Sequence, residues 1–250
     1  MEFSVTHQAI DLYSGDCAVV FVFKDQVQQN IDLQDLLTLN NFDSKVANTL
    51  ALSRVKSYKA SRLIVVGVGE LPLSGKNYVK SMLSLASALE TAKVINVMLP
   101  SIDVDGKDEL WVQQITARVL QNASYQVDKH GIEKENNNTL ASVSVYSALK
   151  DNTALNQGLA IANGMALTRE LGDMPPNICT PSYLAETAQS LAKNYGLECE
   201  ILDEDGMEGL GMNSLLSVGK GSSEPSKLIS LSYKNAGDDQ PIVLDRKSVV

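Results

Sequence analysis

Short apolar segments alternate with amphipathic segments before residue 150, and this alternation restricts the possible folds more than any other feature of the sequence. Residues 17–23 (CAVVFVF) and 62–68 (RLIVVGV) are continuous apolar runs rich in β-branched side chains. Such runs are typical of strands that are buried on both faces. Residues 76–93 instead place their apolar side chains at helical spacing. This order predicts an α/β domain in which helices cover a sheet.

The same periodicities predict three further elements before residue 150. Residues 94–99 and 141–147 favour strands, and a helix is expected over 109–123 after Asp108, a suitable N-cap residue. Between the last two of these elements, residues 131–138 (GIEKENNN) form a polar stretch that predicts a loop. We therefore expect a first α/β domain over residues 1–150.

Residues 171–186 (LGDMPPNICTPSYLAE) hold three of the seven prolines of the chain. A long helix is expected from residue 151, and it must end before Pro175, because the residue that precedes a proline disfavours the helical conformation. Thr180 is expected to cap the next helix with Pro181 at its first position, where the missing N–H costs nothing. The segment therefore predicts a boundary between two domains.

The residues after this boundary predict the beginning of a second α/β layer. The helix that starts at Pro181 is expected to end at Gly196, a residue type suited to the left-handed conformation that closes a helix. A helical stretch is expected over 206–218. Strands are expected over residues 197–202, 227–233 and 241–244.

Charge and composition argue against several classes of function. The chain carries 21 Lys and Arg against 30 Asp and Glu, a net charge of −9, which does not suit binding to nucleic acid. No apolar run is long enough for a membrane span, and the N-terminus has no signal-peptide pattern. The odd number of cysteines suits a reducing compartment, so a cytoplasmic location is expected. The cysteines are Cys17, Cys179 and Cys199.

Familiar catalytic and phosphate-binding motifs are absent from the sequence. The two histidines, His7 and His130, are far apart, and neither belongs to a zinc-binding motif. Residues 67–72 (GVGELP) lack the last glycine of a dinucleotide fingerprint. Residues 217–223 (SVGKGSS) lack the first glycine and the Ser or Thr of a P-loop. Both glycine-rich segments are interpreted as tight turns.

A few reactive residue types remain, and each has a structural interpretation. Asp203, Glu204 and Asp205 are adjacent acids, which the first turn of a helix favours. Cys179 has no histidine placed to activate it, so we expect a small buried residue rather than a nucleophile. Lys220 is expected to be a surface lysine in a turn.

Two blocks between Gly172 and Ala185, Pro-Pro-Asn and Thr-Pro-Ser-Tyr-Leu-Ala, are characteristic of one family. Through them the sequence from residue 151 onward resembles the leucyl aminopeptidase (cytosol aminopeptidase) family, bacterial type. The later blocks LGMNSLLSVGKGSSEPSKLISLSYK and PIVL follow in order, and MEFSV and AVVFVF also resemble bacterial members. The resemblance covers nearly the whole chain, more loosely before residue 150.

The resemblance implies an architecture and an activity. It implies a macro-like N-terminal α/β domain over 1–150, a linking helix over 151–173 and an incomplete start of the catalytic α/β domain over 174–250. Members of the family use two divalent metal ions (manganese, zinc or magnesium) to release N-terminal amino acids from peptides. They assemble as hexamers, so a homo-oligomer is implied, with peptides as substrates.

The sequence departs from the family after Leu244. The resemblance implies that the metal ligands, a lysine with several carboxylates, lie in and beyond a glycine-flanked lysine block at this point. Lys247 falls in the position of the ligand lysine, but Arg246 and Ser248 replace both glycines. Lys247 is therefore the single candidate metal ligand, and we expect no catalytic or cofactor-binding residue, no bound metal and no activity from this chain alone. A truncation or a frameshift would each explain the departure. The alternative is a non-catalytic module for oligomerisation or small-ligand binding.

Overall fold

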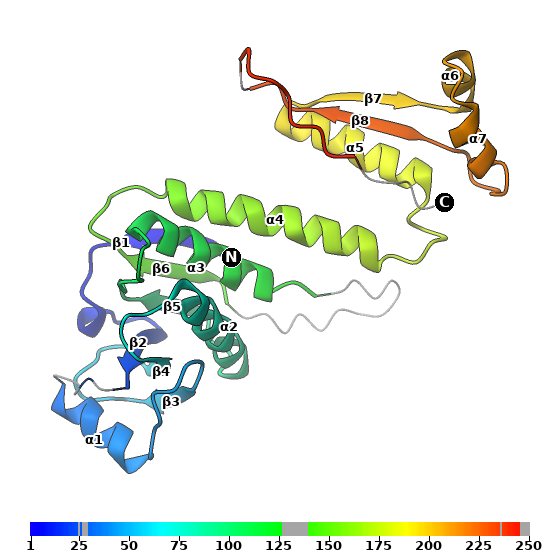
Figure 1. Cartoon of the computed structure of the whole chain (residues 1–250). Coiled ribbons are helices and arrows are strands. Elements are labelled where there is room, and N and C mark those ends of the chain that lie inside the picture. The colour runs from blue at the N-terminus through cyan, green and yellow to red at the C-terminus, as the bar shows by residue number, and fades with distance from the viewer. Residues whose placement is uncertain (25, 27–29, 127–139, 236, 246–250) are drawn as a thin grey trace. The chain divides into compact units, whose positions relative to one another are not determined.

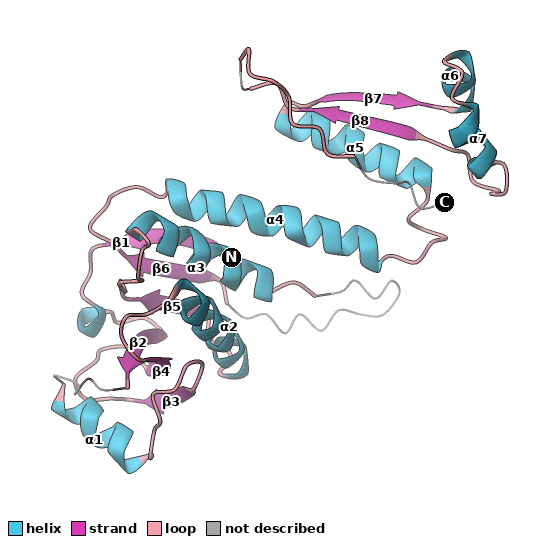
Figure 2. Cartoon of the chain, in the orientation of Figure 1, coloured by secondary structure: helices cyan, strands magenta, loops and turns pink. Residues whose placement is uncertain are grey.

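The structure is a computed structural model that describes residues 1–24, 26, 30–126, 140–235 and 237–245. It divides into two units, Met1–Glu170 and Leu171–Val250. The first unit contains six strands, four α-helices and a short 3-10 helix among its described residues (Figures 1 and 2). In chain order these are β1 (Glu2–Thr6), η1 (Ile10–Leu12), β2 (Cys17–Phe23), α1 (Ile31–Leu39), β3 (Thr49–Ser53), β4 (Arg62–Gly69), α2 (Gly75–Thr91), β5 (Asn96–Leu99), α3 (Glu109–Ala123), β6 (Ser142–Tyr146) and α4 (Thr153–Asp173).

The six strands form one mixed sheet in the order β1-β6-β5-β2-β4-β3. All neighbours pair in parallel except β3, which is antiparallel to β4 at one edge. The parallel strands are connected through helices, as parallel pairing requires. The mixed α/β class expected from the sequence is confirmed.

Side chains of the central strands alternate between two cores. In β2, Cys17 and Val19 join a large cluster with α2 and α3, whereas Ala18 and Val22 face a smaller cluster that contains Leu33 of α1. Strand β4 alternates in the same way. Burial on both faces explains why these strands are continuous apolar runs in the sequence.

Helix α4 packs against α3 within the first unit. Leu155 and Ala162 are buried, and Gly158 sits so close to α3 that a Cβ there would collide with the backbone oxygen of Gln114. A side chain at residue 158 would therefore force the two helices apart. The helix expected to link the domains thus lies, as far as Glu170, with the first unit.

Strand β1 forms the second edge of the sheet, and one of its outward backbone groups has a side-chain partner. The N–H of Glu2 donates to Ala141 and the carbonyl of Thr6 accepts from Ser147, so these residues face β6. Val5 therefore faces away from β6, and its N–H donates to Oδ1 of Asn152 at 2.9 Å. Asn152 directly precedes α4, so the helix start is tied to this edge.

The second unit contains a two-stranded antiparallel sheet and three helices among its described residues. Thr180 caps the first helix through its Oγ1, which accepts from the N–H of Tyr183 at 3.2 Å, and Pro181 is the first helical residue. The helix ends at Gly196 in the left-handed conformation (φ 67°). All three predictions are confirmed. The elements are α5 (Pro181–Tyr195), β7 (Glu198–Leu202), α6 (Glu204–Gly209), α7 (Asn213–Gly219) and β8 (Leu228–Ser232).

Two predictions for the second unit are wrong. Residues 241–245 form no strand, and Ile242, Val243 and Leu244 are 91%, 80% and 93% exposed. A strand needs a neighbour for its backbone groups, and no described strand of this unit lies beside them. The single helical stretch expected over 206–218 is two helices, α6 and α7, separated at Gly211, which has a positive φ of 73°.

Four elements of the first unit, β1, η1, α1 and β3, were not predicted from the sequence. The expected polar loop at 131–138 lies outside the described residues. In the described ranges, no helix combines the length and apolar character that crossing a membrane would require.

Candidate functional site

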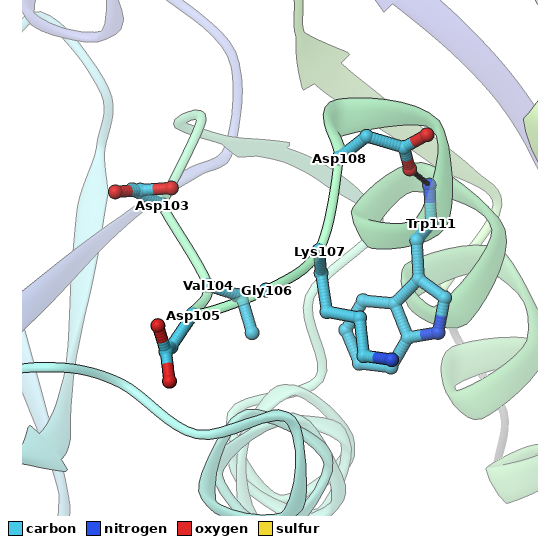
Figure 3. Close-up of a pocket in the computed structure, with 7 residues that line it drawn as sticks. All are labelled: Asp103, Val104, Asp105, Gly106, Lys107, Asp108 and Trp111. Atoms are coloured by element: carbon cyan, nitrogen blue, oxygen red, sulfur yellow. Dashed lines mark hydrogen bonds between the residues drawn. The ribbon is translucent and has the colours of Figure 1, made fainter.

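A surface pocket of about 610 Å³ lies at the carboxyl end of β5. It is lined by the loop from Asp103 to Asp108 and by Trp111 in the first turn of α3 (Figure 3). Strands β5 and β2 are neighbours, but their connections leave in opposite directions: β5 leads to β6 on one side, and β2 leads towards β4 on the other. In open α/β sheets, ligands bind at the carboxyl ends of strands where the connections diverge in this way. The pocket therefore has the place expected of a binding site.

The loop that forms the pocket is anchored to the beginning of α2. The N–H of Asp105 donates to the carbonyl of Leu73 at 2.9 Å, and Val104 is buried. Gly106 has a φ of 65°, a conformation that glycine adopts without strain. The N–H of Lys107 closes the turn on the carbonyl of Val104 at 3.0 Å. These contacts fix the shape of the loop.

The Trp111 ring forms one wall of the pocket, and further aromatic rings connect it to the core. The Lys107 Nζ lies 5.3 Å from the centre of the Trp111 ring, within the range of a cation–π contact. The Trp111 ring centre is 6.1 Å from that of Tyr78, and Tyr78 is 6.3 Å from Phe21 in β2. A Cβ on Gly75 would lie 3.1 Å from Trp111, so the small residue lets the indole approach α2.

The carboxylates of the pocket do not form a metal site. Asp108 is the N-cap of α3, with Oδ1 accepting from the Trp111 N–H at 2.8 Å. Figure 3 shows Asp103 and Asp105 pointing away from Asp108 and Trp111. Among the residues that the structure describes, no three His, Cys, Asp or Glu side chains are grouped so that they could hold a metal ion. The pocket offers one ammonium group, separate acids and an aromatic wall, which suit binding rather than catalysis.

Two buried ionisable groups of the first unit, the Cys17 thiol and the Tyr78 hydroxyl, have raised pKa values and are neutral at ordinary pH. Burial is the main cause that raises the pKa of the Cys17 thiol to about 12, and the nearby Asp16 carboxylate adds to it. The thiol is therefore neutral at ordinary pH and a poor nucleophile. Burial also raises the pKa of Tyr78 well above its usual range, although its hydrogen bond to Thr116 acts in the opposite direction.

The structure places the residues singled out by the sequence as follows. Asp203 caps α6 through a hydrogen bond of 3.0 Å from the Gly206 N–H, with Glu204 and Asp205 in the first turn, as expected. Cys179 is half-buried rather than buried, because it lies in the connection before α5. Lys220 is the exposed C-cap residue of α7.

The remaining candidates are a glycine turn and two residues without a described position. The Gly67–Pro72 segment ends β4 and turns at Gly69, which has a positive φ of 82°, in agreement with its interpretation as a turn. Lys247, the candidate metal ligand, and His130 lie outside the described residues.

Sequence reasoning missed the pocket at Asp103–Asp108. A signal was present, because an Asp-Gly turn and the single Trp of the chain follow directly after a predicted buried strand. The turn can be interpreted as part of a binding site only when the order of the strands in the sheet is known, and the sequence patterns did not predict that order.

Solved structures share this fold. A variant of tomato leucine aminopeptidase superimposes with a TM-score of 0.75 and 21% identity, covering 96% of this chain and 52% of that protein. The bottromycin maturation enzyme BotP gives a TM-score of 0.74 and 22% identity, covering 88% of this chain and 46% of its own. The molecule therefore has the mixed α/β architecture of leucine aminopeptidases and related enzymes.

Sequence comparisons identify the family. The N-terminal domain of the cytosol aminopeptidase family matches residues 19–131, and the catalytic domain of the same family matches residues 166–250. The chain belongs to the cytosol aminopeptidase family.

Curated relatives show how much of a family member the chain covers. A probable cytosol aminopeptidase from Vesicomyosocius okutanii subsp. Calyptogena okutanii (strain HA) is 47% identical over 249 residues, covering 100% of this chain and 52% of that protein. A probable cytosol aminopeptidase from Dechloromonas aromatica (strain RCB) is 37% identical over 276 residues, covering 100% of this chain and 54% of its own length. The chain spans about half the length of the curated relatives it matches.

Proposed function

We propose that the protein to which this chain belongs is a metal-dependent leucyl-type aminopeptidase that releases N-terminal amino acids from peptides. The observation that carries the proposal is the match to both domains of one aminopeptidase family within a single chain. The domain limits are likewise a proposal: an N-terminal domain over 1–150, a linking helix over 151–173 and the start of the catalytic domain over 174–250. A cytoplasmic location is also proposed, and the names of the relatives, probable cytosol aminopeptidases, support it.

The metal pair of the family, proposed as manganese, zinc or magnesium, does not fit the described residues. A divalent ion needs several converging anionic oxygens, and the described ranges contain no such group. Lys247 lies outside those ranges, and a single lysine amine carries no negative charge to offset the ion. A solved relative, BotP, binds Mn, which supports metal dependence for the family. We propose that residues 1–250 alone bind no metal pair and hydrolyse no peptide.

A chimera tests both parts of the proposal. Residues 1–244 are joined to the remaining part of the Vesicomyosocius relative, which is 47% identical to this chain. The substrate is a leucine amide whose amide carries a reporter group. With Mn²⁺ added, the chimera is expected to release this reporter group. The 250-residue polypeptide and the added part of the relative, each alone, are expected to give no turnover.

Two results would count against the proposal. A chimera that is folded by circular dichroism and matches the relative in mass, but releases no reporter, would contradict the aminopeptidase function. Metal-dependent turnover by the pure 250-residue polypeptide, removed by EDTA and restored by Mn²⁺, would contradict its inactivity.

A non-catalytic role is the second candidate, and the pocket beside Trp111 favours it in its ligand-binding form. The indole should then report binding through its fluorescence, because Trp111 is the single Trp of the chain. Small molecules would be screened for a change in this emission. A compound that changes the emission of the normal chain but not that of Lys107→Ala would support this role. The hexamer of the family is likewise a proposal, and light scattering of the chain with and without the full relative would test it.

A further inference from the structure

Helices α3 and α4 run side by side in the same direction and touch at matched positions. Gln114 of α3 is opposite Gly158 and its neighbour Gln157, whose Oε1 accepts from the Gln114 Nε2 at 3.5 Å. Further along, Tyr125, just after α3, contacts Arg169 of α4. The interval from Gln114 to Tyr125 equals that from Gly158 to Arg169, eleven residues in each case. Eleven residues of α4 span about 16 Å, so α4 contacts the α3 segment at two places that lie this far apart along its axis.

The two halves of α4 are held in different ways. In the first half, Leu155 and Ala162 are buried and Gly158 allows the backbones to approach closely. In the second half, Gly164 and Gly172 have no heavy atom near the place of a Cβ, and Met165 is 41% exposed. Apolar burial therefore fixes the first half and does little for the second.

Arg169 supplies the contact that holds the second half. Its guanidinium carbon lies 4.0 Å from the centre of the Tyr125 ring, and its Nη1 donates to Oδ1 of Asn122 at 3.4 Å. A guanidinium stacked on an aromatic face is attracted by the negative charge of the ring face. Because Arg169 is exposed, the attraction is modest, and the contact can open and close.

We propose that Arg169 is a positioning residue that latches the second half of α4 onto the end of α3 through the face of Tyr125. Gly164 is the point at which the helix can bend when the latch opens, because glycine is the weakest non-proline helix former. Glu170 is the last residue of the first unit, so the latch restrains the chain where it leaves that unit. The inference does not depend on the proposed aminopeptidase activity.

Amide hydrogen exchange of the full chain, followed by mass spectrometry, tests the latch. Arg169→Gln and Tyr125→Leu are each expected to speed exchange over residues 164–170 about two- to five-fold, the range that an exposed cation–π contact can provide. Residues 155–162 should be unchanged, because burial holds them. Tyr125→Phe keeps the ring face that Arg169 contacts and should exchange more slowly over residues 164–170 than Tyr125→Leu. Lys193→Gln, in α5, is the matched control for loss of a positive charge.

The double variant Arg169→Gln with Tyr125→Leu distinguishes a shared contact from two separate effects. It should exchange no faster over 164–170 than either single variant. Additive acceleration, an equal change along all of α4, or no change in the single variants would each overturn the proposal. Exchange in Tyr125→Phe as fast as in Tyr125→Leu would do the same. If circular dichroism shows that Tyr125→Leu is unfolded, Arg169→Gln is compared with Arg169→Lys instead. Because lysine retains the positive charge, Arg169→Lys should keep part of the protection that Arg169→Gln loses.

Discussion

The hydroxyl of Tyr78 in α2 lies 2.6 Å from Oγ1 of Thr116 in α3, inside the larger core cluster. The Thr116 hydroxyl donates its hydrogen to the carbonyl of Val112 at 2.7 Å. Tyr78 must therefore be the donor to Thr116, and the buried phenol and threonine satisfy each other. This contact joins the two helices that cover one face of the sheet.

Removing either partner of this hydrogen bond should destabilise the chain to different extents. Tyr78→Phe loses one bond and leaves Thr116 bonded to Val112, so about 1 kcal/mol is expected. Thr116→Val leaves the Tyr78 hydroxyl buried without its acceptor, which should cost about 1–3 kcal/mol. Urea unfolding of both variants and of the double variant measures these changes. A Thr116→Val variant as stable as the normal chain would show that the phenol finds another partner.

Substitution by alanine should change the stability of the chain in opposite directions at two glycines of α4. Gly158→Ala would push a methyl group into the backbone of Gln114, and overpacking of this kind costs about 1–3 kcal/mol. Gly164→Ala meets no atom within 4 Å, and alanine is the better helix former by roughly 0.5–1 kcal/mol. Thermal unfolding of the two variants provides the comparison. The packing of α4 on α3 would be in doubt if both substitutions stabilised the chain.

The three thiols should differ in reactivity with a disulfide reagent at pH 8. Cys17 is fully buried and its pKa is raised to about 12, so it should react only after unfolding. Cys179 and Cys199 are half-buried and should react first. The number of thiols that react is measured with and without urea, in the normal chain and in Cys17→Ala. The comparison shows whether the slowly reacting thiol is that of Cys17. Three equally fast thiols in the folded chain would contradict the burial of β2.

Alkaline pH should weaken the fold through the same thiol. Its pKa rises on folding from 9.0 to about 12, so the unfolded state loses its proton first as the pH increases. The stability that this group contributes is therefore complete below about pH 9 and is lost progressively as the pH rises towards 12. Urea midpoints at pH 8 and pH 10.5 should fall less in Cys17→Ala than in the normal chain. An equal fall in both would assign the effect to other groups.

Local sequence signals predicted the helix ends well because the groups that satisfy them are close in the chain. Asp108 and Thr180 accept hydrogen bonds from residues three positions later, and Gly196 closes its own helix. The apolar runs of β2 and β4 were equally clear, because both faces of these strands are buried. These features required no knowledge of the tertiary fold.

The features that the sequence did not reveal depend on distant parts of the chain. Residues 241–244 have strand composition, but no described strand of their unit lies beside them. The edge strand β3 alternates only weakly between exposed and half-buried residues. The pocket beside Trp111 follows β5, and the pairing of β5 with β2 that gives this place its meaning cannot be inferred from either segment alone.

The carboxamide of Asn152 also limits what the sheet can join. An unpaired edge strand is a template onto which another extended chain can add by backbone hydrogen bonding. At β1 that template is interrupted, because the outward N–H of Val5 is already occupied. A further strand could pair with the N–H of Val5 only by displacing the side chain of the residue that directly precedes a 21-residue helix. The contact between Asn152 and Val5 therefore hinders the addition of another strand at the β1 edge, the step by which fibrils grow.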